Sequence, residues 1–370
     1  MWQKAKLHRK PKILICPLDW GIGHATRDVP IIRELLGQGA DVVIGAGNRP
    51  LAFLKKEFPG LTFIDFPGYD VEYPSGKNMI LKMAASTPKI LKKIKEENRF
   101  LDKLIDELKP DAVISDNRFG LWTKRVPSVF ITHQIMIKGP AFLEPLLYKI
   151  NLSYISKYDE CWIPDFENGN SLTGDLSHKY PLPENSFFIG PLSRFADNTG
   201  EAETFRTDNN YKSDILVMLS GPEPQRTILE EIILKHIEAL DLKSVFLKGK
   251  TEENIRPISK GRIKFFSHLE SDELKKYLLN TDMVITRAGY STIMDIAALG
   301  KKAILIPTPG QTEQEYIAKR FFEKAIYYSI EQDKFNLQTA MNEVVIFTGL
   351  KRTYDNSVLK ERIAALLNRC

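Results

Sequence analysis

A short loop near the amino terminus has the residue types that acid–base chemistry needs. Gly21, Gly23 and His24 follow the apolar run at residues 12–17. Glycine permits backbone conformations that other residues avoid, so these two glycines indicate a tight turn. A histidine directly after that turn, at the start of a helix, could act as a general base because its ordinary pKa is about 6.5. A structural or helix-capping histidine fits the same position.

Two further polar residues stand where other apolar runs of the first half end. Asp116 follows the run at residues 111–115, and His133 follows the run at residues 128–132. Strand ends of this kind are where the functional groups of parallel sheets gather. Asp116 could be a base or a sugar ligand, and a solvated loop aspartate fits equally well. The candidate catalytic residues are therefore His24, Asp116 and His133.

The second half contains a turn suited to an anion. An apolar run at residues 282–285 leads into a turn at Gly289, and Ser291 or Thr292 could start the helix that follows. Such a turn places backbone N–H groups and a helix N-terminus at the carboxyl edge of a sheet, which suits phosphate. Asp295 lies about one helical turn further on, where its carboxylate could accept hydrogen bonds from sugar hydroxyls.

Other loops of the second half follow apolar runs in the same way. Residues 307–315 form a polar turn, and together with residues 286–295 they suggest a nucleotide-sugar pocket. Two ordinary strand–helix turns are the simpler alternative. At residues 266–269, backbone groups could read a nucleobase, while His268 itself fits a structural role.

The loop at residues 220–227 is the counterpart of the amino-terminal glycine loop. Gly221 permits a sharp turn, and N–H groups there could hold a diphosphate while Arg226 adds positive charge. A rigid proline turn with a solvated arginine is the alternative.

Alternation of apolar runs and helical patterns sets the expected architecture. The expected strands are residues 12–17, 41–46, 61–66, 111–115, 128–132, 160–164, 186–190, 214–219, 244–247, 262–266, 282–285, 303–306 and 325–329. The main helical patterns are residues 29–36, 81–108, 142–156 and 351–368. Nearly continuous apolar strands separated by helices predict parallel sheets covered on both faces.

The length of 370 residues exceeds a usual single core, so two domains are expected. We predict an N-terminal acceptor-side domain over residues 1–195, a polar linker at 196–212 and a C-terminal nucleotide-sugar domain at 213–350. A final helix within 351–370 is expected to pack back on the N-terminal domain.

Composition narrows the class of protein. Apolar residues make up 43% of the chain, and no apolar run approaches the roughly 20 residues that span a bilayer. Residues 1–10 lack the apolar core of a signal peptide. The 3 cysteines are far apart in sequence, which favours a reduced, cytoplasmic protein and gives no metal-ligand spacing. The net charge of +5 is modest, and scattered basic residues argue against nucleic-acid binding.

These loops together resemble a known family. Arg287-Ala288-Gly289 with Asp295, followed by Gln311 through Gln314 and Ala318, resembles the carboxyl-terminal signature of glycosyltransferase family 28. That family includes the N-acetylglucosaminyltransferase of peptidoglycan lipid II synthesis. The segment from Gly21 to Arg27 resembles the amino-terminal loop of the same family and of its nucleotide-sugar hydrolase relatives. The match covers both halves in order, and its specificity lies in the loops.

The resemblance implies an α/β protein with the GT-B fold, in which two Rossmann-like parallel-sheet domains face each other across a cleft. It implies that Asp295, where many relatives have glutamate, holds the donor ribose, and that Gln314 and Glu313 contact the donor sugar. It places residues 287–289 near the diphosphate and His24 near the acceptor or diphosphate. The expected donor-side residues are Gly21, Gly23, Gly221, Arg226, His268, Leu269, Arg287, Ala288, Gly289, Asp295, Gln311, Glu313 and Gln314.

Two segments depart from the family pattern. Gly221-Pro222-Glu223-Pro224 replaces the glycine-rich diphosphate loop of the lipid II enzyme, and His133-Gln134 matches the acceptor-side motif only in part. The donor geometry is therefore better supported than the identity of the acceptor. No Asp-x-Asp pair occurs, in keeping with a reaction that requires no metal and no cofactor besides a UDP-sugar co-substrate.

The resulting hypothesis is inverting, metal-independent transfer of a sugar, such as N-acetylglucosamine, from a UDP-sugar to a glycan or lipid-linked acceptor. A nucleotide-sugar hydrolase and a non-catalytic nucleotide-sugar-binding protein are the alternatives. Residues 79–100 alternate apolar and lysine positions, so they form either a basic amphipathic helix on the inner face of a membrane or a surface helix of their own domain.

Overall fold

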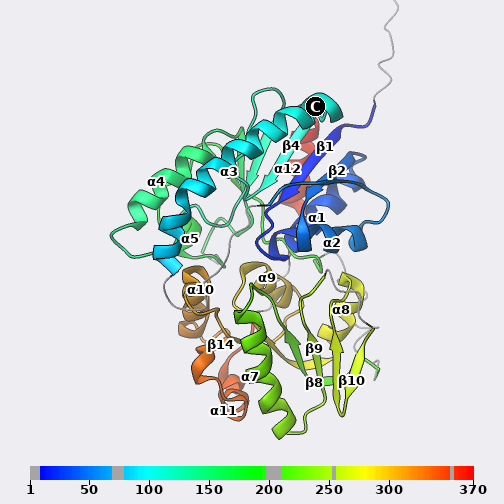
Figure 1. Ribbon diagram of the computed structural model, residues 1–370, viewed down its shortest axis with the longest axis vertical. Coiled ribbons are helices and arrows are strands. Elements are labelled where there is room, and N and C mark those ends of the chain that lie inside the picture. The colour runs from blue at the N-terminus through cyan, green and yellow to red at the C-terminus, as the bar shows by residue number, and fades with distance from the viewer. Residues whose placement is uncertain (1–8, 69–78, 170, 197–209, 252–255, 351–353) are drawn as a thin grey trace, which may run out of the picture.

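The computed structural model describes residues 9–68, 79–169, 171–196, 210–251, 256–350 and 354–370, with the backbone alone described at 79–87. The chain forms two lobes, each built on a β-sheet flanked by helices (Figure 1). Helices α9 and α10 of the second lobe lie at the boundary between the lobes. The expected α/β fold with two parallel-dominated sheets is confirmed.

Seven strands of the described residues form the first sheet, in the order β3-β2-β1-β4-β5-β6-β7 with every neighbouring pair parallel. They are β1 (Lys12–Pro17), β2 (Asp41–Ala46), β3 (Thr62–Asp65), β4 (Ala112–Asp116), β5 (Ser128–Ile131), β6 (Glu160–Ile163) and β7 (Ser186–Phe188). The helices of this part are α1 (Gly23–Gly37), α2 (Asn48–Glu57), α3 (Met79–Leu108), α4 (Glu144–Ile155) and α5 (Asp175–His178).

The second sheet has the order β10-β11-β9-β8-β12-β13-β14 within the described chain, and only its edge pair β10–β11 is antiparallel there. Its strands are β8 (Ser213–Met218), β9 (Ser244–Leu247), β10 (Ile258–Lys260), β11 (Ile263–Phe266), β12 (Thr281–Thr286), β13 (Ala303–Leu305) and β14 (Tyr328–Ser329). The α-helices are α7 (Gln225–Ala239), α8 (Ser271–Leu279), α9 (Tyr290–Ala298), α10 (Thr312–Glu323), α11 (Leu337–Glu343) and α12 (Ser357–Leu367), with short 3-10 helices at Gln332–Lys334 and Val344–Ile346.

The strand order determines where a ligand can bind. The order in which the chain adds strands reverses between β1 and β4 in the first sheet and between β8 and β12 in the second. Crevices form at such switch points because the connections on either side run to opposite faces of the sheet. The loop after β1 leads to His24, and the loop after β4 contains Asn117. The loop after β12 contains Gly289.

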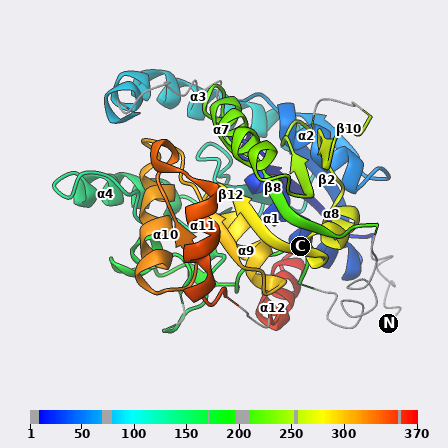
Figure 2. The ribbon, with the colours of Figure 1, turned by 90° about the horizontal axis from the view of Figure 1, so that it is seen from below.

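The last helix lies against the first lobe. Gln38 Nε2 at the end of α1 donates to the carbonyl oxygen of Lys360 at 3.0 Å, and Arg362 pairs with Glu160 of β6 at 2.8 Å. Figure 2 shows α12 in red beside the carboxyl terminus. The chain therefore crosses from the first lobe to the second and returns.

Several element boundaries differ from the sequence-based expectation. Helix α1 begins at Gly23 rather than at residue 29, so His24 lies within its first turn. Helix α9 begins at Tyr290 behind Gly289 and has no side-chain cap, so the expected cap at Ser291 or Thr292 is wrong. Strand β14 is shorter than the run at 325–329 because Ala325 adopts a positive φ of 51°.

Arg118 holds the carboxyl edge of the first sheet together. Its buried guanidinium donates to the carbonyl oxygens of Pro17 at 2.8 Å and Pro67 at 3.0 Å. It also pairs with the buried carboxylate of Glu97 on α3 at 2.6 Å. One side chain thus joins the end of β1, the segment after β3 and α3, and so fixes the loop that leads to His24.

Replacing this arginine tests the clamp. Arg118→Leu should lower the free energy of unfolding by about 3–5 kcal/mol, because it removes the charge that compensates a buried carboxylate. Urea denaturation measures the change. Arg125→Leu is the matched control, since Arg125 pairs with Asp106 at the surface and should leave the urea midpoint near that of the wild type. Equal midpoints for the two variants would contradict the clamp.

Candidate active site

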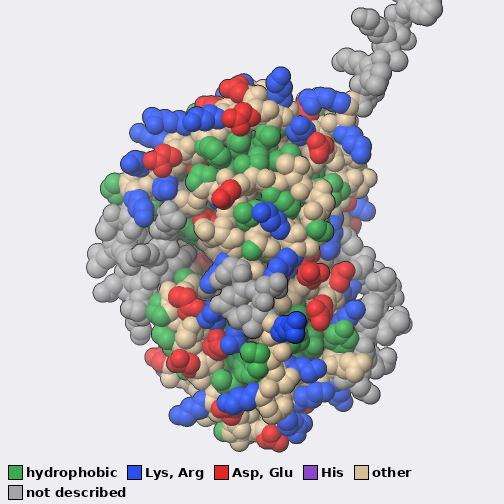
Figure 3. All heavy atoms as spheres, turned by 45° about the vertical axis from the view of Figure 1, so that its right-hand side comes forward, with side chains coloured by type: hydrophobic (Ala, Val, Ile, Leu, Met, Phe, Trp, Pro, Cys, Tyr) green, Lys and Arg blue, Asp and Glu red, His purple; other side chains and the backbone are tan. Residues whose placement is uncertain are grey.

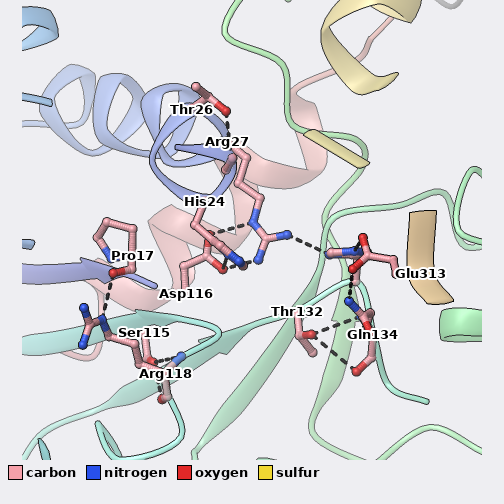
Figure 4. A network of polar contacts seen from close by, with 12 residues as sticks. Pro17, His24, Thr26, Arg27, Ser115, Asp116, Arg118, Thr132, Gln134 and Glu313 are labelled. Carbon is pink, nitrogen blue, oxygen red and sulfur yellow. Dashed lines mark hydrogen bonds and ion pairs between the residues drawn. The ribbon is translucent and has the colours of Figure 1, made fainter. Parts of the chain in front are cut away.

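His24 and Asp116 meet at the switch point of the first sheet. His24 lies in the first turn of α1, and Asp116 is the last residue of β4. His24 Nδ1 lies 3.0 Å from Asp116 Oδ1 (Figure 4). An ionised carboxylate only accepts hydrogen bonds, so Nδ1 carries the proton and Nε2 keeps its lone pair. No group in the described chain hydrogen-bonds Nε2, and the side chain is 14% exposed.

Burial and charge set the ionisation of this pair. Burial raises the pKa of Asp116, but the positive charge of Arg27 and the contacts with His24 outweigh it and hold that pKa well below its ordinary range. Burial lowers the pKa of His24, while the Asp116 charge opposes this shift. His24 is therefore a neutral imidazole at neutral pH, which is the form a general base requires.

Arg27 extends the pair into a network that joins the lobes. Its guanidinium makes two hydrogen bonds to Asp116, one of them from Nε at 2.6 Å, and a third to His133 Nδ1 at 2.8 Å. His133 Nε2 in turn donates to Glu313 Oε1 of α10 at 2.8 Å, and Gln134 donates to the other oxygen of Glu313. The His133 ring also stacks on Tyr290 of α9, with ring centroids 4.4 Å apart.

The network corrects two proposed catalytic roles. Asp116 is fully buried and bonded to His24 and Arg27, so it orients the histidine and does not reach a substrate as a base. His133 is buried and both of its ring nitrogens are engaged, so it bridges Arg27 to Glu313 and has no lone pair left for a proton.

The turn after β12 faces His24 from the second lobe. A Cβ atom placed on Gly23 would lie 3.4 Å from Ser291 Oγ, which brings the glycine loop and the start of α9 into contact. Gly289 occupies the N-cap position and supplies no side-chain acceptor. Within the described residues, no protein group therefore accepts a hydrogen bond from the N–H groups of Tyr290, Ser291 and Thr292. Such a helix end attracts an anion.

Arg287 lies beneath this turn. It is fully buried, and its guanidinium donates to the carbonyl oxygens of Gln225 at 2.7 Å and Pro307 at 3.2 Å and to Gln332 Oε1 at 2.6 Å. Burial lowers its pKa to about 9. These bonds tie together the segments around three strand ends, so Arg287 supports the turn and does not present its charge to a diphosphate. Ala288 beside it is also buried.

Asp295 is occupied by the first lobe. Its carboxylate accepts hydrogen bonds from Ser193 Oγ at 2.8 Å and Arg194 Nε at 3.0 Å, and it is almost fully buried. Burial raises its pKa in spite of the Arg194 charge. The carboxylate thus fastens α9 to residues 192–195 in this conformation, and the ribose contact stays a prediction.

The remaining donor-side residues divide into two groups. Gln314, in the first turn of α10, accepts a hydrogen bond at Oε1 from the Thr308 N–H at 2.9 Å, and Gln311 is the N-cap residue of that helix without a side-chain cap bond. Both residues therefore lie beside the loop after β13. A Cβ atom placed on Gly221, whose φ is +98°, would lie 3.8 Å from Thr308 Oγ1. These loops do come together with Glu313 at the carboxyl edge of the second sheet.

The residues of the other group are paired with carboxylates or buried. Arg226 pairs with Glu223 and Glu230, at 2.6 and 2.8 Å, so its charge is already compensated. His268 packs edge-on against Phe53 of α2, and burial lowers its pKa to about 3. Leu269 is a core residue.

Arg27 and Tyr290 were absent from the expected catalytic and donor-side residues. Arg27 stands three positions after His24 in a helix, so it shares one face of the helix with that histidine, and this spacing was the available signal. The stacking of Tyr290 on His133 joins two lobes and has no sequence signal.

Figure 3 shows basic and acidic side chains interspersed over both lobes, and no helix of the described chain has the length and apolarity to cross a membrane.

Known proteins are similar to this chain in sequence and in fold. Residues 227–354 match the glycosyltransferase family 28 C-terminal domain. The chain is 26% identical over 323 residues to an uncharacterised glycosyltransferase of Methanosarcina acetivorans, covering 82% of this chain and 79% of that protein.

A second relative comes from Sulfurihydrogenibium. It is named as a UDP-N-acetylglucosamine–N-acetylmuramyl-(pentapeptide) pyrophosphoryl-undecaprenol N-acetylglucosamine transferase and is 23% identical, with coverage of 82% of this chain and 85% of that protein. The structure of the glycosyltransferase of kitacinnamycin superposes with a TM-score of 0.61 at 15% identity, covering 98% of this chain and 95% of that one. The protein is therefore a glycosyltransferase of the GT-B fold that is similar to family 28, with its residues 227–354 matching that family's carboxyl-terminal domain.

Proposed function

We propose that the protein is an inverting, metal-independent glycosyltransferase that moves a sugar from a UDP-sugar to a glycan or lipid-linked acceptor. The observation that carries the proposal is the position of an unbonded His24 Nε2 near the uncapped start of α9. Direct transfer of a sugar needs two groups, a base and an anion site, and here they lie on opposite lobes.

The chemistry follows from these two groups. The acceptor hydroxyl attacks the anomeric carbon as the bond from that carbon to the diphosphate oxygen breaks. His24 Nε2 takes the hydroxyl proton, and Asp116 stabilises the imidazolium that forms. The departing UDP keeps the electron pair of the broken bond, and the N–H groups at the start of α9 stabilise its charge. Attack from the face opposite UDP inverts the anomeric centre.

The sugar and the acceptor are proposed from relatives. The Sulfurihydrogenibium protein is named for transfer of N-acetylglucosamine to a lipid-linked acceptor. A lipid-linked acceptor would bring the protein to a membrane surface. Leu146 and Ile150 are exposed four residues apart on one face of α4, and the exposed Phe142 lies two residues before that helix begins. By contrast, Ile94 of α3 is buried in its own lobe.

Turnover of a UDP-sugar tests the function. With UDP-N-acetylglucosamine we expect UDP release that rises when a lipid-linked or glycan acceptor is added and that persists in EDTA. Coupled assay of UDP gives the rate. Equal release with and without every acceptor would identify a nucleotide-sugar hydrolase, and activity that depends on added magnesium or manganese would contradict the metal-independent mechanism.

The role of His24 is tested by its removal. His24→Ala should reduce turnover by roughly 10²–10⁴-fold while leaving UDP affinity much less changed, because the nucleotide contacts the other lobe. In the wild type, the lowered pKa of His24 should keep kcat/KM constant through neutral pH and make it fall only below about pH 6.5. A near-normal rate in the variant, or an equally steep loss of UDP binding, would remove His24 from the base role.

Substitution of Asp295 shows whether its carboxylate binds the donor ribose or only joins the two lobes. Asp295→Ala should weaken UDP binding by roughly 1–3 kcal/mol if the carboxylate binds ribose hydroxyls. Ser193→Ala removes one bond from the same carboxylate and should leave UDP affinity close to that of the wild type. Isothermal titration with UDP measures both. If the two variants lose the same affinity, Asp295 acts only through the contact between the lobes.

A further inference from the structure

A helix of the second lobe is capped by a residue of the first lobe. Helix α8 begins at Ser271, and its N-cap residue, Glu270, makes no side-chain cap bond. Glutamate is not among the residues that cap a helix well from that position. Glu57, the last residue of α2, supplies the acceptor instead: its Oε1 atom accepts from the Ser271 N–H and from Ser271 Oγ, both at 2.7 Å. The cap therefore exists only while the two lobes are in contact, with α8 below α2 in Figure 1.

The charge and the burial of Glu57 strengthen this contact. Its side chain is 5% exposed, and its Oε2 atom pairs with Arg33 Nη2 of α1 at 3.7 Å. A carboxylate at a helix N-terminus is stabilised by the unbonded N–H groups and by the helix dipole. Hydrogen bonds to an ionised acceptor are also stronger than bonds between neutral groups. Removal of Glu57 would deprive the first N–H of α8 and the buried Ser271 hydroxyl of this acceptor.

Further contacts hold the same helix, α2, against the second lobe. Thr251 Oγ1 donates to the carbonyl oxygen of Arg49 at 3.0 Å, and Lys56 Nζ donates to the carbonyl oxygen of Thr251 at 3.1 Å. The His268 ring packs edge-on against Phe53, with ring centroids 5.4 Å apart. Thr251 follows β9 and His268 follows β11. Helix α2 therefore lies along the boundary between the lobes, against the loops after two strands of the second sheet.

The position of α2 is coupled to that of His24. Arg33, which pairs with Glu57, lies in α1, and His24 lies in the first turn of the same helix. At that end of α1, a Cβ atom placed on Gly23 would lie 3.4 Å from Ser291 Oγ at the start of α9. Because α1 and α2 belong to one lobe, a change in how α2 meets α8 also changes how His24 faces α9.

We propose that Glu57 is a positioning residue for sugar transfer: by capping α8 from the first lobe, it holds the lobes in the arrangement in which His24 faces the anion site. This role rests on the base function of His24 given under the proposed function. Glu57 acts through the contact between the lobes. Its loss therefore slows the chemical step, which depends on the position of the base, and leaves the binding of UDP by the second lobe nearly unchanged.

Three variants separate the cap from other effects of substitution. Glu57→Ala removes the acceptor. Glu57→Gln keeps a side-chain oxygen that can accept both bonds from Ser271, so it should rescue most of what alanine loses. Glu34→Ala is the matched control, because the Glu34 carboxylate of α1 accepts from Gln38 of its own helix at 2.8 Å.

Hydrogen exchange followed by mass spectrometry measures the cap directly. In Glu57→Ala, the amides at the start of α8 should exchange about tenfold faster than in the wild type, because the helix end loses its acceptor and frays. Glu57→Gln and Glu34→Ala should exchange at close to the wild-type rate. Unchanged exchange at residues 271–274 in Glu57→Ala would overturn the proposal.

Small-angle X-ray scattering measures the arrangement of the lobes. Loss of the cap should raise the radius of gyration of Glu57→Ala, whereas Glu57→Gln and Glu34→Ala should match the wild type. Equal radii for all four proteins would show that other contacts set the arrangement, and would reject the role of Glu57. Neither exchange nor scattering uses turnover, so both decide this role even where sugar transfer fails.

Turnover measures the consequence for the chemistry. With UDP-N-acetylglucosamine, kcat of Glu57→Ala should fall about tenfold, while KM for the donor and Kd for UDP stay within about threefold of the wild type. Glu57→Gln should restore most of kcat. A lower melting temperature with unchanged kcat in the folded Glu57→Ala protein would mean that Glu57 is merely structural. A wild type that binds UDP and transfers no sugar would count against the proposed function alone.

Discussion

The ionised carboxylate of Asp116 is the constraint on which the site depends. It lies at the end of a central strand, fully buried, where a charge is tolerated only if donors surround it. Arg27 and His24 supply those donors from one face of α1. The same bonds that satisfy Asp116 therefore set the tautomer of His24 and leave Nε2 available. The same set of hydrogen bonds therefore stabilises the buried charge of Asp116 and prepares His24 to act as a base.

That arrangement continues across the boundary between the lobes. Arg27 also bonds His133, which bonds Glu313 of the second lobe. Asp295, on the same side of the boundary as Glu313, is held by Ser193 and Arg194. Both carboxylates expected to meet the donor are thus satisfied by protein groups in this conformation. A UDP-sugar that used them would exchange these bonds for its own, which links ligand entry to movement of the lobes.

The second lobe meets the charge of a diphosphate mainly with backbone. Arg287 and Arg226, the two arginines nearest the strand-end loops in sequence, are engaged by backbone carbonyls or by carboxylates. Within the described residues, the start of α9 has no side-chain cap because Gly289 occupies the N-cap position, and α10 likewise begins at Gln311 without a side-chain cap bond. Backbone N–H groups at a helix end are fixed in direction by the helix itself, so they are ordered before the anion arrives. This also explains why a glycine, and not serine or threonine, stands at the cap position.

The sequence by itself determined the architecture and the position of the loops. Segments such as Lys12–Pro17 and Asp41–Ala46 are strands with the predicted bounds, because a strand covered on both faces is apolar at nearly every position. The order of those strands then places His24 and the Gly289 turn at switch points. The tertiary structure alone decided which polar side chains are free. In the sequence, Asp116, His133 and Arg287 are candidates for contact with a ligand. In the structure they are bonded to Arg27, Glu313 and Gln332, which in most cases lie tens of residues or more away along the chain. A hydrogen bond between such distant residues leaves no local pattern in the sequence.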